Sequence, residues 1–387
     1  MIAIILGVIA GLLLGENAKH VKILGDIFIR LLRMIIIPLI LSSMVVGIVS
    51  IGNARNLGRI GLRTFVYYMV TTLLAVTVGL ILVNIIRPGV GVELAAEGFD
   101  SSSHVPPSVV SVVTDIIPKN VFKSMAQDKV LSIIFISILF GVALSSIGEK
   151  GKQLISFFES FNSAMMKITD WIMKLAPVGV FALMAWTIGE MGLGVIKPLA
   201  KYMGTVVLGL LIHACVTLPV LLYVFGKYSP LKFIKHMFSA VATAFSTASS
   251  AATLPITMDC LEKKAGVSNK VASFVLPLGA TVNMDGTALY EAVAAMFIAQ
   301  AYGIDLSLWH QIIIMLTATL ASIGAAAIPG AGLVTMVIVL KAVGLPLEGI
   351  GMILAVDRIL DMCRTSVNVW GDSCGAAVIA RLEGEEI

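Results

Sequence analysis

The sequence predicts an all-α polytopic membrane protein, for two reasons. First, 58% of its 387 residues are hydrophobic and only 13% are charged, whereas soluble domains carry about 25% charged residues. Second, several apolar runs approach the roughly 20 residues that a helix needs to cross a bilayer. We therefore expect a multi-pass protein of the cell membrane, without a nucleic-acid partner.

The apolar runs dominate the first part of the chain and recur near its end. The first run lacks a basic leader and a convincing cleavage site, so we expect a membrane span there instead of a signal peptide. We expect long, uninterrupted helices up to about residue 230 and shorter, broken ones after it. The runs comprise residues 1–15, 34–51, 64–86, 130–144, 178–188, 203–223 and 312–320.

The positions of Lys and Arg between these runs predict the orientation in the membrane. Segment 88–118 contains neither residue and is rich in Ser, Pro and Gly, so we place it outside the cell. Three basic loops are expected in the cytoplasm. They contain Arg55, Arg59 and Arg63; Lys227, Lys232 and Lys235; and Lys263, Lys264 and Lys270.

Two segments after residue 230 have the pattern of hairpins that enter the membrane and return. Residues 241–258 and 319–336 each carry a run of small residues followed by a proline, and they are expected to enter from opposite faces. Such a pair indicates an inverted repeat whose broken helices present free backbone groups to a solute. The alternative is a pair of ordinary helix contacts made by small residues.

The segment between these hairpins, residues 276–297, combines helix breakers with polar side chains. Pro277 lacks a backbone donor and disturbs the turn before it, so we expect local unwinding near Asn283. Unwound carbonyl groups, the Asn283 amide and the Asp285 carboxylate would supply the oxygen ligands that a hard cation prefers. Ionisable groups inside a membrane indicate function by default.

The last long segment has a narrow polar face. At about 100° per residue, five polar residues between 357 and 372 fall on one stripe. Asp361 can hold an ammonium group and Arg364 can pair with a carboxylate in bidentate fashion, which suits a zwitterion with a second acid group. The alternative is that Asp361 and Arg364 form a structural ion pair with each other. The stripe comprises Asp357, Asp361, Arg364, Asn368 and Asp372.

The motifs NMDGT (283–287), IPGAG (328–332) and DMCRTSVNVWGD (361–372) occur in this order along the chain. In these motifs, and in the TLP sequence of the first hairpin, the chain resembles the glutamate transporter family, the dicarboxylate/amino acid:cation symporters. The resemblance implies a homotrimer whose subunits have eight transmembrane helices and two re-entrant helical hairpins in inverted repeats. It also implies elevator-type transport, in which a mobile unit carries its substrate past a static scaffold.

The same resemblance divides the chain into parts. It implies scaffold helices 1 and 2 in residues 1–57, transport-domain helix 3 in 58–87, an extracellular loop in 88–126, and scaffold helices 4 and 5 in 127–194. Residues 195–387 would complete the transport domain with helix 6, a first hairpin at about 231–264, helix 7, a second hairpin at about 308–345, and helix 8.

The resemblance also implies roles for single residues. Arg364 would hold the side-chain carboxylate of aspartate or glutamate, Asp361 the amino group, and Asn368 the α-carboxylate. The implied substrate set is Ala248, Ser250, Thr287, Ile328, Gly332, Asp361, Arg364, Thr365 and Asn368. Three sodium sites are implied as well, formed by Gly279, Asn283, Asn368 and Asp372; by Tyr68, Thr71, Thr72, Asn283 and Asp285; and by backbone oxygens around Thr281, Ser322, Ile323 and Ala325.

Three positions depart from the family pattern. Glu291 stands where archaeal relatives carry Gln, which makes it a candidate proton carrier, with potassium as a candidate counter-ion. Arg358 lies a turn from the site and either replaces an arginine that the family places near the substrate or supports Asp357 or Asp361. Ala325 stands in place of a threonine, which would leave the third sodium site with backbone ligands alone.

The expected function is symport of acidic amino acids driven by the sodium gradient, without a cofactor. A C4-dicarboxylate or neutral amino acid symporter of the same fold is the alternative. The resemblance also implies an anion conductance beside transport. An intramembrane enzyme is disfavoured, because we find no nucleophile–base pairing and the five histidines are dispersed along the sequence.

Overall fold

The computed structural model describes residues 2–54, 59–92, 116–127, 129–323 and 331–387, and every regular element in these ranges is helical. The expected all-α class is therefore confirmed for them. The helices are α1 (Ile2–Leu14), α2 (Lys19–Ala54), α3 (Arg59–Ile86), α5 (Val121–Ala126), α6 (Val130–Ser146), α7 (Lys152–Lys174), α8 (Ala176–Met191), α9 (Ile196–Ile212), α10 (Leu218–Gly226), α11 (Pro230–Thr247), α12 (Ser250–Cys260), α13 (Asn269–Val282), α14 (Asp285–Ala301), α15 (Leu308–Ile323), α16 (Ala331–Ala342) and α17 (Ile350–Leu382).

Among the described residues, α3 and the continuous helix Ile196–Gly226 are long and apolar enough to cross a membrane by length and composition. Shorter apolar stretches lie in α1, α2, α6, α8, α15 and α16. Many large apolar side chains on these helices are exposed, among them Leu13 of α1, Ile85 of α3 and Leu211 of α9. Exposed apolar faces of this kind are suited to contact with lipid.

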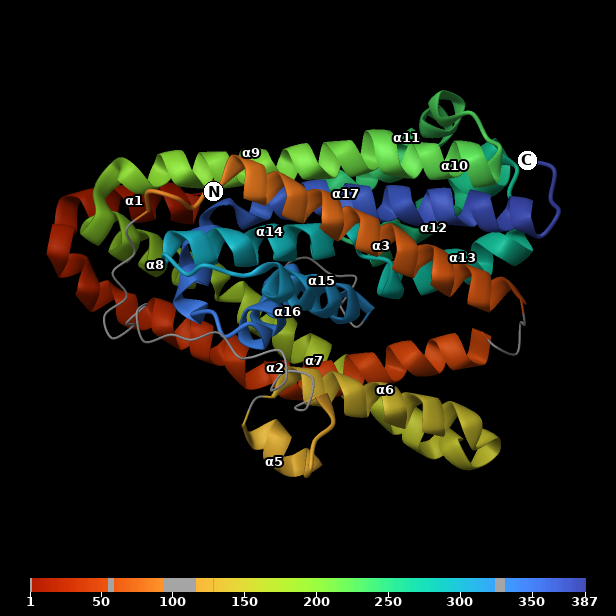
Figure 1. Ribbon diagram of the computed structural model, residues 1–387, viewed down its shortest axis with the longest axis horizontal. Helices are drawn as coiled ribbons and strands as arrows, with labels where there is room; N and C mark the ends of the chain where they lie inside the picture. Colours follow the sequence, from red (N-terminus) through yellow and green to blue (C-terminus); the bar gives the residue numbers. More distant parts are fainter. Residues whose placement is uncertain (1, 55–58, 93–115, 128, 324–330) are drawn as a thin grey trace.

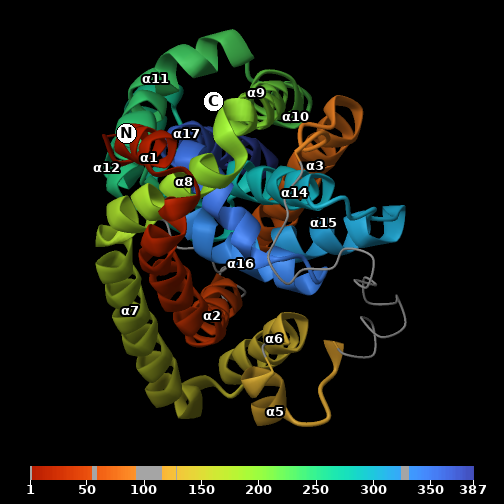
Figure 2. The same cartoon turned by 90° about the vertical axis from the view of Figure 1, so that its left-hand side faces the viewer.

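The helices form two groups. In one group, α1, α2, α6, α7 and α8 pack against one another; in the other, α3 and α9 to α17 pack around α14 and α17. Figure 1 shows the second group as long, roughly parallel rods, with α2, α6 and α7 below them. In the end-on view of Figure 2, α16 lies between α2 and the rest of the second group.

Helix α14 is the centre of the second group. All but one of its residues are buried, since only Gln300 is partly exposed. A helix that is buried on every side must be apolar or small all round, and its C-terminal half, AAMFIA, meets this requirement. The polar residues Asp285, Thr287 and Glu291 occupy its N-terminal half, which faces the polar stripe of α17.

Two breaks in the second group lie in segments where the sequence predicts them. Helix α13 ends at Val282, and Asn283 has an extended backbone (φ −95°, ψ 95°) before α14 begins at Asp285, so the predicted unwinding at Asn283 is confirmed. Helices α11 and α12 meet at Ala248, whose φ of 51° is left-handed, and Ser249 caps α12 by accepting the Ala252 N–H at 3.2 Å.

One feature of the helices was not expected from the sequence. The run 203–223 lies in a continuous helix, as expected, but within it residues His213–Thr217 form a π-helical turn between α9 and α10. This turn inserts an additional residue and re-aims the side chains around it. The apolar composition of the run gives no sign of it.

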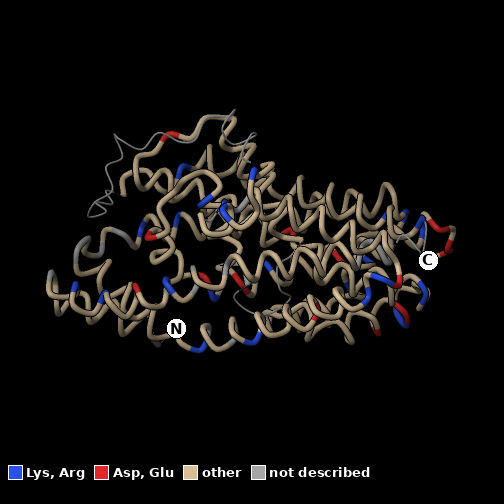
Figure 3. The backbone as a smooth tube through the Cα atoms, turned by 90° about the horizontal axis from the view of Figure 1, so that it is seen from below, with Lys and Arg blue, Asp and Glu red and all other residues tan. Residues whose placement is uncertain are grey.

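The basic residues expected in the cytoplasm include several that lie together. Arg59 and Arg63 at the start of α3 pair with Glu383 directly after α17, at N–O distances of 3.2 and 2.8 Å. Lys263 pairs with Asp259 near the end of α12. Figure 3 shows Lys, Arg, Asp and Glu close together at the end of the molecule that holds the C terminus.

Candidate functional site

The polar stripe of α17 is buried, as its periodicity predicts. Between 1% and 5% of each of its five residues is exposed, and Arg364 is the largest side chain in the described residues that is almost fully enclosed. Buried charges are costly unless they are paired or hydrogen-bonded. The surroundings of the stripe therefore show what its residues can do. They divide into two clusters, one near each half of the stripe.

The first cluster, here called the arginine cluster, consists of Arg364, Asp357, Asp361 and Tyr290. Arg364 Nη1 donates to Asp357 Oδ1 at 2.8 Å, and its Nε donates to Asp361 Oδ1 at 3.1 Å. The Tyr290 hydroxyl donates to the same Asp357 oxygen at 2.8 Å, and its ring centroid lies 4.2 Å from the guanidinium carbon. The guanidinium is thus held between two carboxylates and stacked on an aromatic ring.

This geometry bears on the alternatives left open by the sequence. The ion pair between Asp361 and Arg364 does form, but Asp357 is an equally close partner of the arginine, so two carboxylates share one guanidinium. Arg358 lies with Nη1 3.6 Å from Asp361 Oδ2 and about half of its side chain exposed. In this structure Arg358 therefore supports Asp361.

Residues from other helices surround the arginine cluster. A Cβ atom at Gly332, near the start of α16, would lie 3.0 Å from Arg364 Cζ and 3.2 Å from the Thr287 methyl group. Glycine thus lets the backbone of the second hairpin lie directly against the guanidinium. Thr365 lies beside Arg364 on α17 and is buried.

At the tip of the first hairpin, Ala248 and Ser250 are also buried. Both arms of this hairpin, α11 and α12, contact α17. The Ser366 hydroxyl lies 3.4 Å from the backbone oxygen of Val241 and joins α17 to α11. Ile328 lies outside the described residues.

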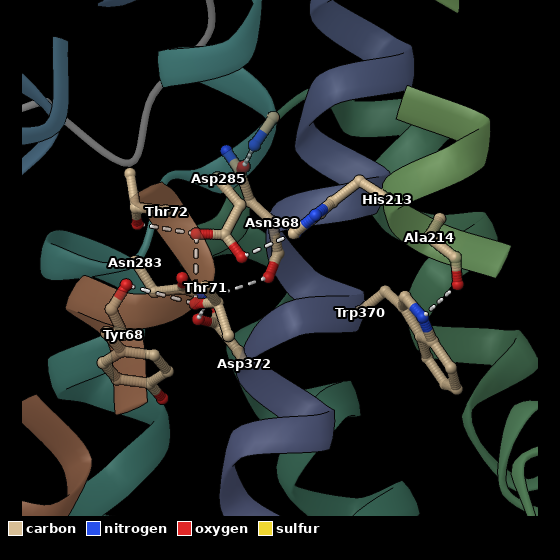
Figure 4. A network of polar contacts seen from close by, with 11 residues as sticks. Tyr68, Thr71, Thr72, His213, Ala214, Asn283, Asp285, Asn368, Trp370 and Asp372 are labelled. Carbon is tan, nitrogen blue, oxygen red and sulfur yellow. Dashed lines mark hydrogen bonds and ion pairs between the residues drawn. The ribbon is translucent and has the colours of Figure 1, made fainter. Parts of the chain in front are cut away.

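The second cluster, here called the carboxylate cluster, contains Asp285 and Asp372 and is drawn in Figure 4. Asp285 Oδ1 accepts hydrogen bonds from Thr72 at 2.6 Å and Thr71 at 3.2 Å, both on α3. Its other oxygen lies 3.0 Å from His213 Nε2. Three elements, α3, α14 and the π-helical turn, therefore meet at one fully buried carboxylate.

Asp372 lies beside the break between α13 and α14. Its Oδ1 accepts from Asn283 Nδ2 at 2.9 Å, while Asn283 Oδ1 is buried and has no hydrogen-bond partner among the described residues. A Cβ at Gly279 would lie 2.4 Å from Asp372 Oδ1 and 2.5 Å from the Tyr68 hydroxyl. Several oxygen atoms thus converge here, one of them lacking a donor, and such a set suits a small hard cation.

Asn368 connects the two clusters. Its Oδ1 accepts the Gly286 N–H at 2.8 Å, and its Nδ2 donates to Thr287 Oγ1 at 3.2 Å. Both contacts fix α17 against the first turn of α14. They lie between the two clusters along the stripe.

The described residues implied for the third sodium site differ in burial. Thr281 is exposed at the end of α13, and its hydroxyl donates to Leu278 O at 3.1 Å. Ser322 is buried near the end of α15 with its hydroxyl on Thr319 O at 2.7 Å, and the adjacent Ile323 is buried too. Ala325 lies outside the described residues.

Glu291 is fully buried, two turns along α14 from Asp285. One carboxyl oxygen accepts a short hydrogen bond from Thr335 of α16, and the other has no partner among the described residues. Glu291 thus joins the central helix to the second hairpin.

Sequence reasoning missed three members of these clusters. Asp357 lay on the predicted stripe, but its only expected contact was with Arg358. Tyr290 lies in the segment 276–297, where only the residues around it were given roles. His213 was read as one of five dispersed histidines, and only the fold brings it to Asp285, 72 positions further along the chain.

Known proteins match this chain over nearly its whole length. The proton/sodium-glutamate symport protein of Bacillus subtilis (strain 168) is 39% identical over 99% of this chain and 91% of its own length. The proton/glutamate-aspartate symporter of Escherichia coli (strain K12) is 39% identical over 99% of the chain and 92% of its own. Human excitatory amino acid transporter 3 is 38% identical over 100% and 85%. The sequence profile of the sodium:dicarboxylate symporter family matches residues 1–382, and the chain belongs to this family.

Proposed function

We propose that the protein is a membrane symporter that takes up glutamate or aspartate together with sodium. The observation that carries this proposal is the buried guanidinium of Arg364, held between Asp357 and Asp361 in the middle of a helix. An arginine in this position offers a planar fork that matches a carboxylate. The names of the relatives, which include glutamate and aspartate symporters driven by sodium or protons, support the same substrates.

In the proposed complex, the substrate exchanges partners with the arginine cluster. The side-chain carboxylate takes the fork of Arg364, and the amino group takes Asp361, so that both protein charges keep a partner. Asn368 and Thr365 receive the α-carboxylate, while Thr287 assists Arg364. Such an exchange avoids the cost of leaving a buried charge unpaired.

The two hairpins would close this pocket from opposite sides. Helices α12 and α16 begin at Ser250 and Ala331, after the two hairpin tips. Their N-termini carry free backbone N–H groups and a partial positive charge that favour an anionic substrate. Backbone groups of Ala248 and Ser250, and of Ile328 and Gly332, are the proposed contacts.

Sodium ions would occupy the carboxylate cluster. The deeper proposed site uses Tyr68, Thr71, Thr72, Asn283 and Asp285, and a second uses Gly279, Asn283, Asn368 and Asp372. The unpartnered Asn283 Oδ1 supports both assignments. Backbone oxygens of Thr281, Ser322, Ile323 and Ala325 are proposed for a third site that forms as the second hairpin closes.

For the movement itself we propose the elevator mechanism of a homotrimer. Residues 1–57 and 127–194 would form the static scaffold, and residues 58–87 and 195–387 the mobile transport domain. Helices α1, α2, α6, α7 and α8 pack mainly against one another, and so do α3 and α9 to α17, which supports this division. A side conductance for anions would lie between the two parts.

Glu291 is the proposed proton carrier. Its contact with Thr335 would link the proton to the position of the second hairpin, and its burial favours the neutral form during the crossing. Potassium is a candidate counter-ion for the return of the empty carrier.

A C4-dicarboxylate is the alternative substrate class, and the family description names dicarboxylates. Asp361 distinguishes an acidic amino acid from a C4-dicarboxylate, because a C4-dicarboxylate has no ammonium group to pair with this carboxylate. A neutral amino acid would leave Arg364 without its carboxylate partner and is disfavoured for that reason.

The test is uptake into proteoliposomes with sodium, proton and potassium gradients imposed one at a time. We expect accumulation of labelled aspartate or glutamate that requires inward sodium and is inhibited by the other acidic amino acid. Equal uptake with choline in place of sodium on both sides, without a pH difference, would contradict the proposal.

A further inference from the structure

His213 is not one of the proposed sodium ligands, yet its imidazole contacts the carboxylate of one of them, Asp285. Its Nε2 lies 3.0 Å from Asp285 Oδ2, and both side chains are fully buried. The other ring nitrogen, Nδ1, has no hydrogen-bond partner among the described residues. A carboxylate can only accept, so the tautomer that fits this contact carries its hydrogen on Nε2 and donates it to Asp285.

The direction of the imidazole depends on the π-helical turn, of which His213 is the first residue. In such a turn the backbone hydrogen bonds are displaced by one residue, and π-turns within α-helices are frequent at functional sites. The Trp370 indole of α17 donates to the backbone oxygen of Ala214 at 3.0 Å. Figure 4 shows Trp370 on one side of α17 and the carboxylate cluster on the other, with His213 reaching across between them.

The contacts of Asp285 are divided between its two oxygens. Thr71 and Thr72 bond to Oδ1, and within the described part of the chain His213 is the hydrogen-bond partner of Oδ2. The single hydrogen of the Thr71 hydroxyl can go to Tyr68 O at 3.1 Å instead of Asp285, and in that orientation a lone pair can face a cation. With Oδ2 held by His213, the carboxylate plane is fixed and Oδ1 points toward the hydroxyl groups of α3.

We propose that His213 is a positioning residue that fixes the Asp285 carboxylate for sodium at the deeper site, and that Trp370 maintains the π-helical turn that aims it. The inference rests on the proposed sodium symport and adds to it a residue outside the ion's own ligands. Groups that orient a metal-binding carboxylate typically change metal affinity about 10- to 100-fold when they are replaced.

The experiment compares His213→Gln with His213→Asn in the full-length protein in proteoliposomes. A glutamine amide reaches about as far as imidazole Nε2 and can still donate to Asp285, whereas an asparagine amide ends near the position of Nδ1. We expect His213→Asn to raise the sodium concentration for half-maximal aspartate uptake about 10-fold or more, and His213→Gln to stay within about threefold of the parent. The rate at saturating sodium should change much less than the half-saturation concentration.

Two further variants complete the design. Trp370→Phe keeps an aromatic ring but loses the indole N–H, and we expect it to raise the same sodium concentration by a few-fold. His236 provides the matched control, because its ring bonds to the Tyr228 hydroxyl at 3.1 Å, away from the carboxylate cluster. His236→Asn should leave the sodium dependence unchanged.

Equal sodium dependence in the Asn and Gln variants of His213 would overturn the inference, and so would an unchanged value in His213→Asn. If His213→Asn yields no folded protein, an unchanged sodium dependence in Trp370→Phe overturns it instead. A parent protein without sodium-dependent uptake would contradict the proposed function itself, which is a different result from either of these.

Discussion

The arginine cluster and the carboxylate cluster lie on the same face of α17, yet they manage buried charge in opposite ways. In the arginine cluster, one guanidinium is shared by two carboxylates. In the carboxylate cluster, Asp285 and Asp372 have no ion pair to Lys or Arg among the described residues, and their partners are hydroxyl, amide and imidazole groups. The first cluster carries its own cation and the second does not.

This difference indicates what each cluster binds. Four carboxylates against one guanidinium leave a negative balance when all are ionised, and a dicarboxylic amino acid would add to it. Carrying such a balance through a bilayer is costly, so several cations must accompany the substrate. The arginine cluster contains a guanidinium and can therefore bind an anionic group without a further cation. The carboxylate cluster becomes neutral only when cations bind in it.

The largest effect is expected when a charge is removed from the carboxylate cluster. In Asp285→Asn, sodium-driven uptake should fall on the order of 1,000-fold, because a unit charge in contact with an ion is worth several kcal/mol even at an effective dielectric constant of about 20. The measurement is initial uptake of labelled aspartate over a range of sodium concentrations. Asp259→Asn, at an exposed carboxylate paired with Lys263, is the control. A variant with parental sodium dependence would exclude Asp285 as a ligand.

The next largest effect is expected when a neutral group replaces the cation of the arginine cluster. Arg364→Gln should reduce aspartate uptake a few hundred-fold, which corresponds to the lower end of the roughly 3–5 kcal/mol that removal of one partner from a buried ion pair typically costs. Sodium-dependent uptake of small neutral amino acids should appear in its place. Because the carboxylate cluster is intact, the sodium dependence should persist. Arg59→Gln, at an exposed arginine paired with Glu383, is the matched control, and unaltered aspartate selectivity in Arg364→Gln would remove Arg364 from its proposed role.

A smaller effect is expected for the carboxylate that shares the guanidinium. Asp357→Asn keeps the shape but weakens two hydrogen bonds, those from Arg364 and Tyr290. We expect about a tenfold loss of apparent aspartate affinity, the amount that one charge-assisted hydrogen bond provides, with little change in sodium affinity. Competition binding of aspartate measures it. A change in sodium affinity alone would show that the two clusters are not separate.

The sequence was sufficient for the parts of both clusters that lie on one helix or at one break. The stripe from Asp357 to Asp372 follows from helical periodicity, and the unwound backbone at Asn283 follows from the breakers around it. These signals are local. The partner that each polar residue meets is not local, which is why the contact of Asp357 with Tyr290 and that of Asp285 with His213 were not predicted.

The π-helical turn shows this limit most clearly. Residues 203–223 are apolar throughout, and helix propensity does not separate an α-turn from a π-turn. The indole of Trp370, which donates to Ala214 O in the turn, comes from a residue more than 150 positions further along the chain. The signal available in the sequence was a histidine within an apolar run. Its distance from the other histidines was not a valid reason to disregard it as a site residue.

A several-fold effect is expected for Glu291, which belongs to neither cluster but is the third buried carboxylate of this region without a Lys or Arg partner among the described residues. Glu291→Gln should retain sodium-driven uptake and lose the stimulation by an inward proton gradient, because glutamine resembles the protonated acid and cannot release a proton. Uptake at several external pH values measures it, with Glu149→Gln, at an exposed glutamate, as the control. Full pH dependence in the variant would refute the proton-carrier role.

The smallest effect is expected where paired charges lie in water. Hydrogen bonds from Arg59 and the charges of Arg59 and Arg63 hold the pKa of Glu383 below the ordinary carboxyl value of 4.5. A lowered pKa in the folded state means that the ion pairs stabilise the protein above pH 4.5 and lose this effect as the pH falls through the folded value. Surface ion pairs contribute little, so Glu383→Gln should lower the melting temperature by about 1–2 °C at pH 7. The gap between variant and parent should close in acid, while aspartate affinity and sodium dependence stay unchanged. A large loss of uptake at pH 7 would instead show that a pair in water acts on transport as strongly as the buried clusters do, and would remove the distinction between them.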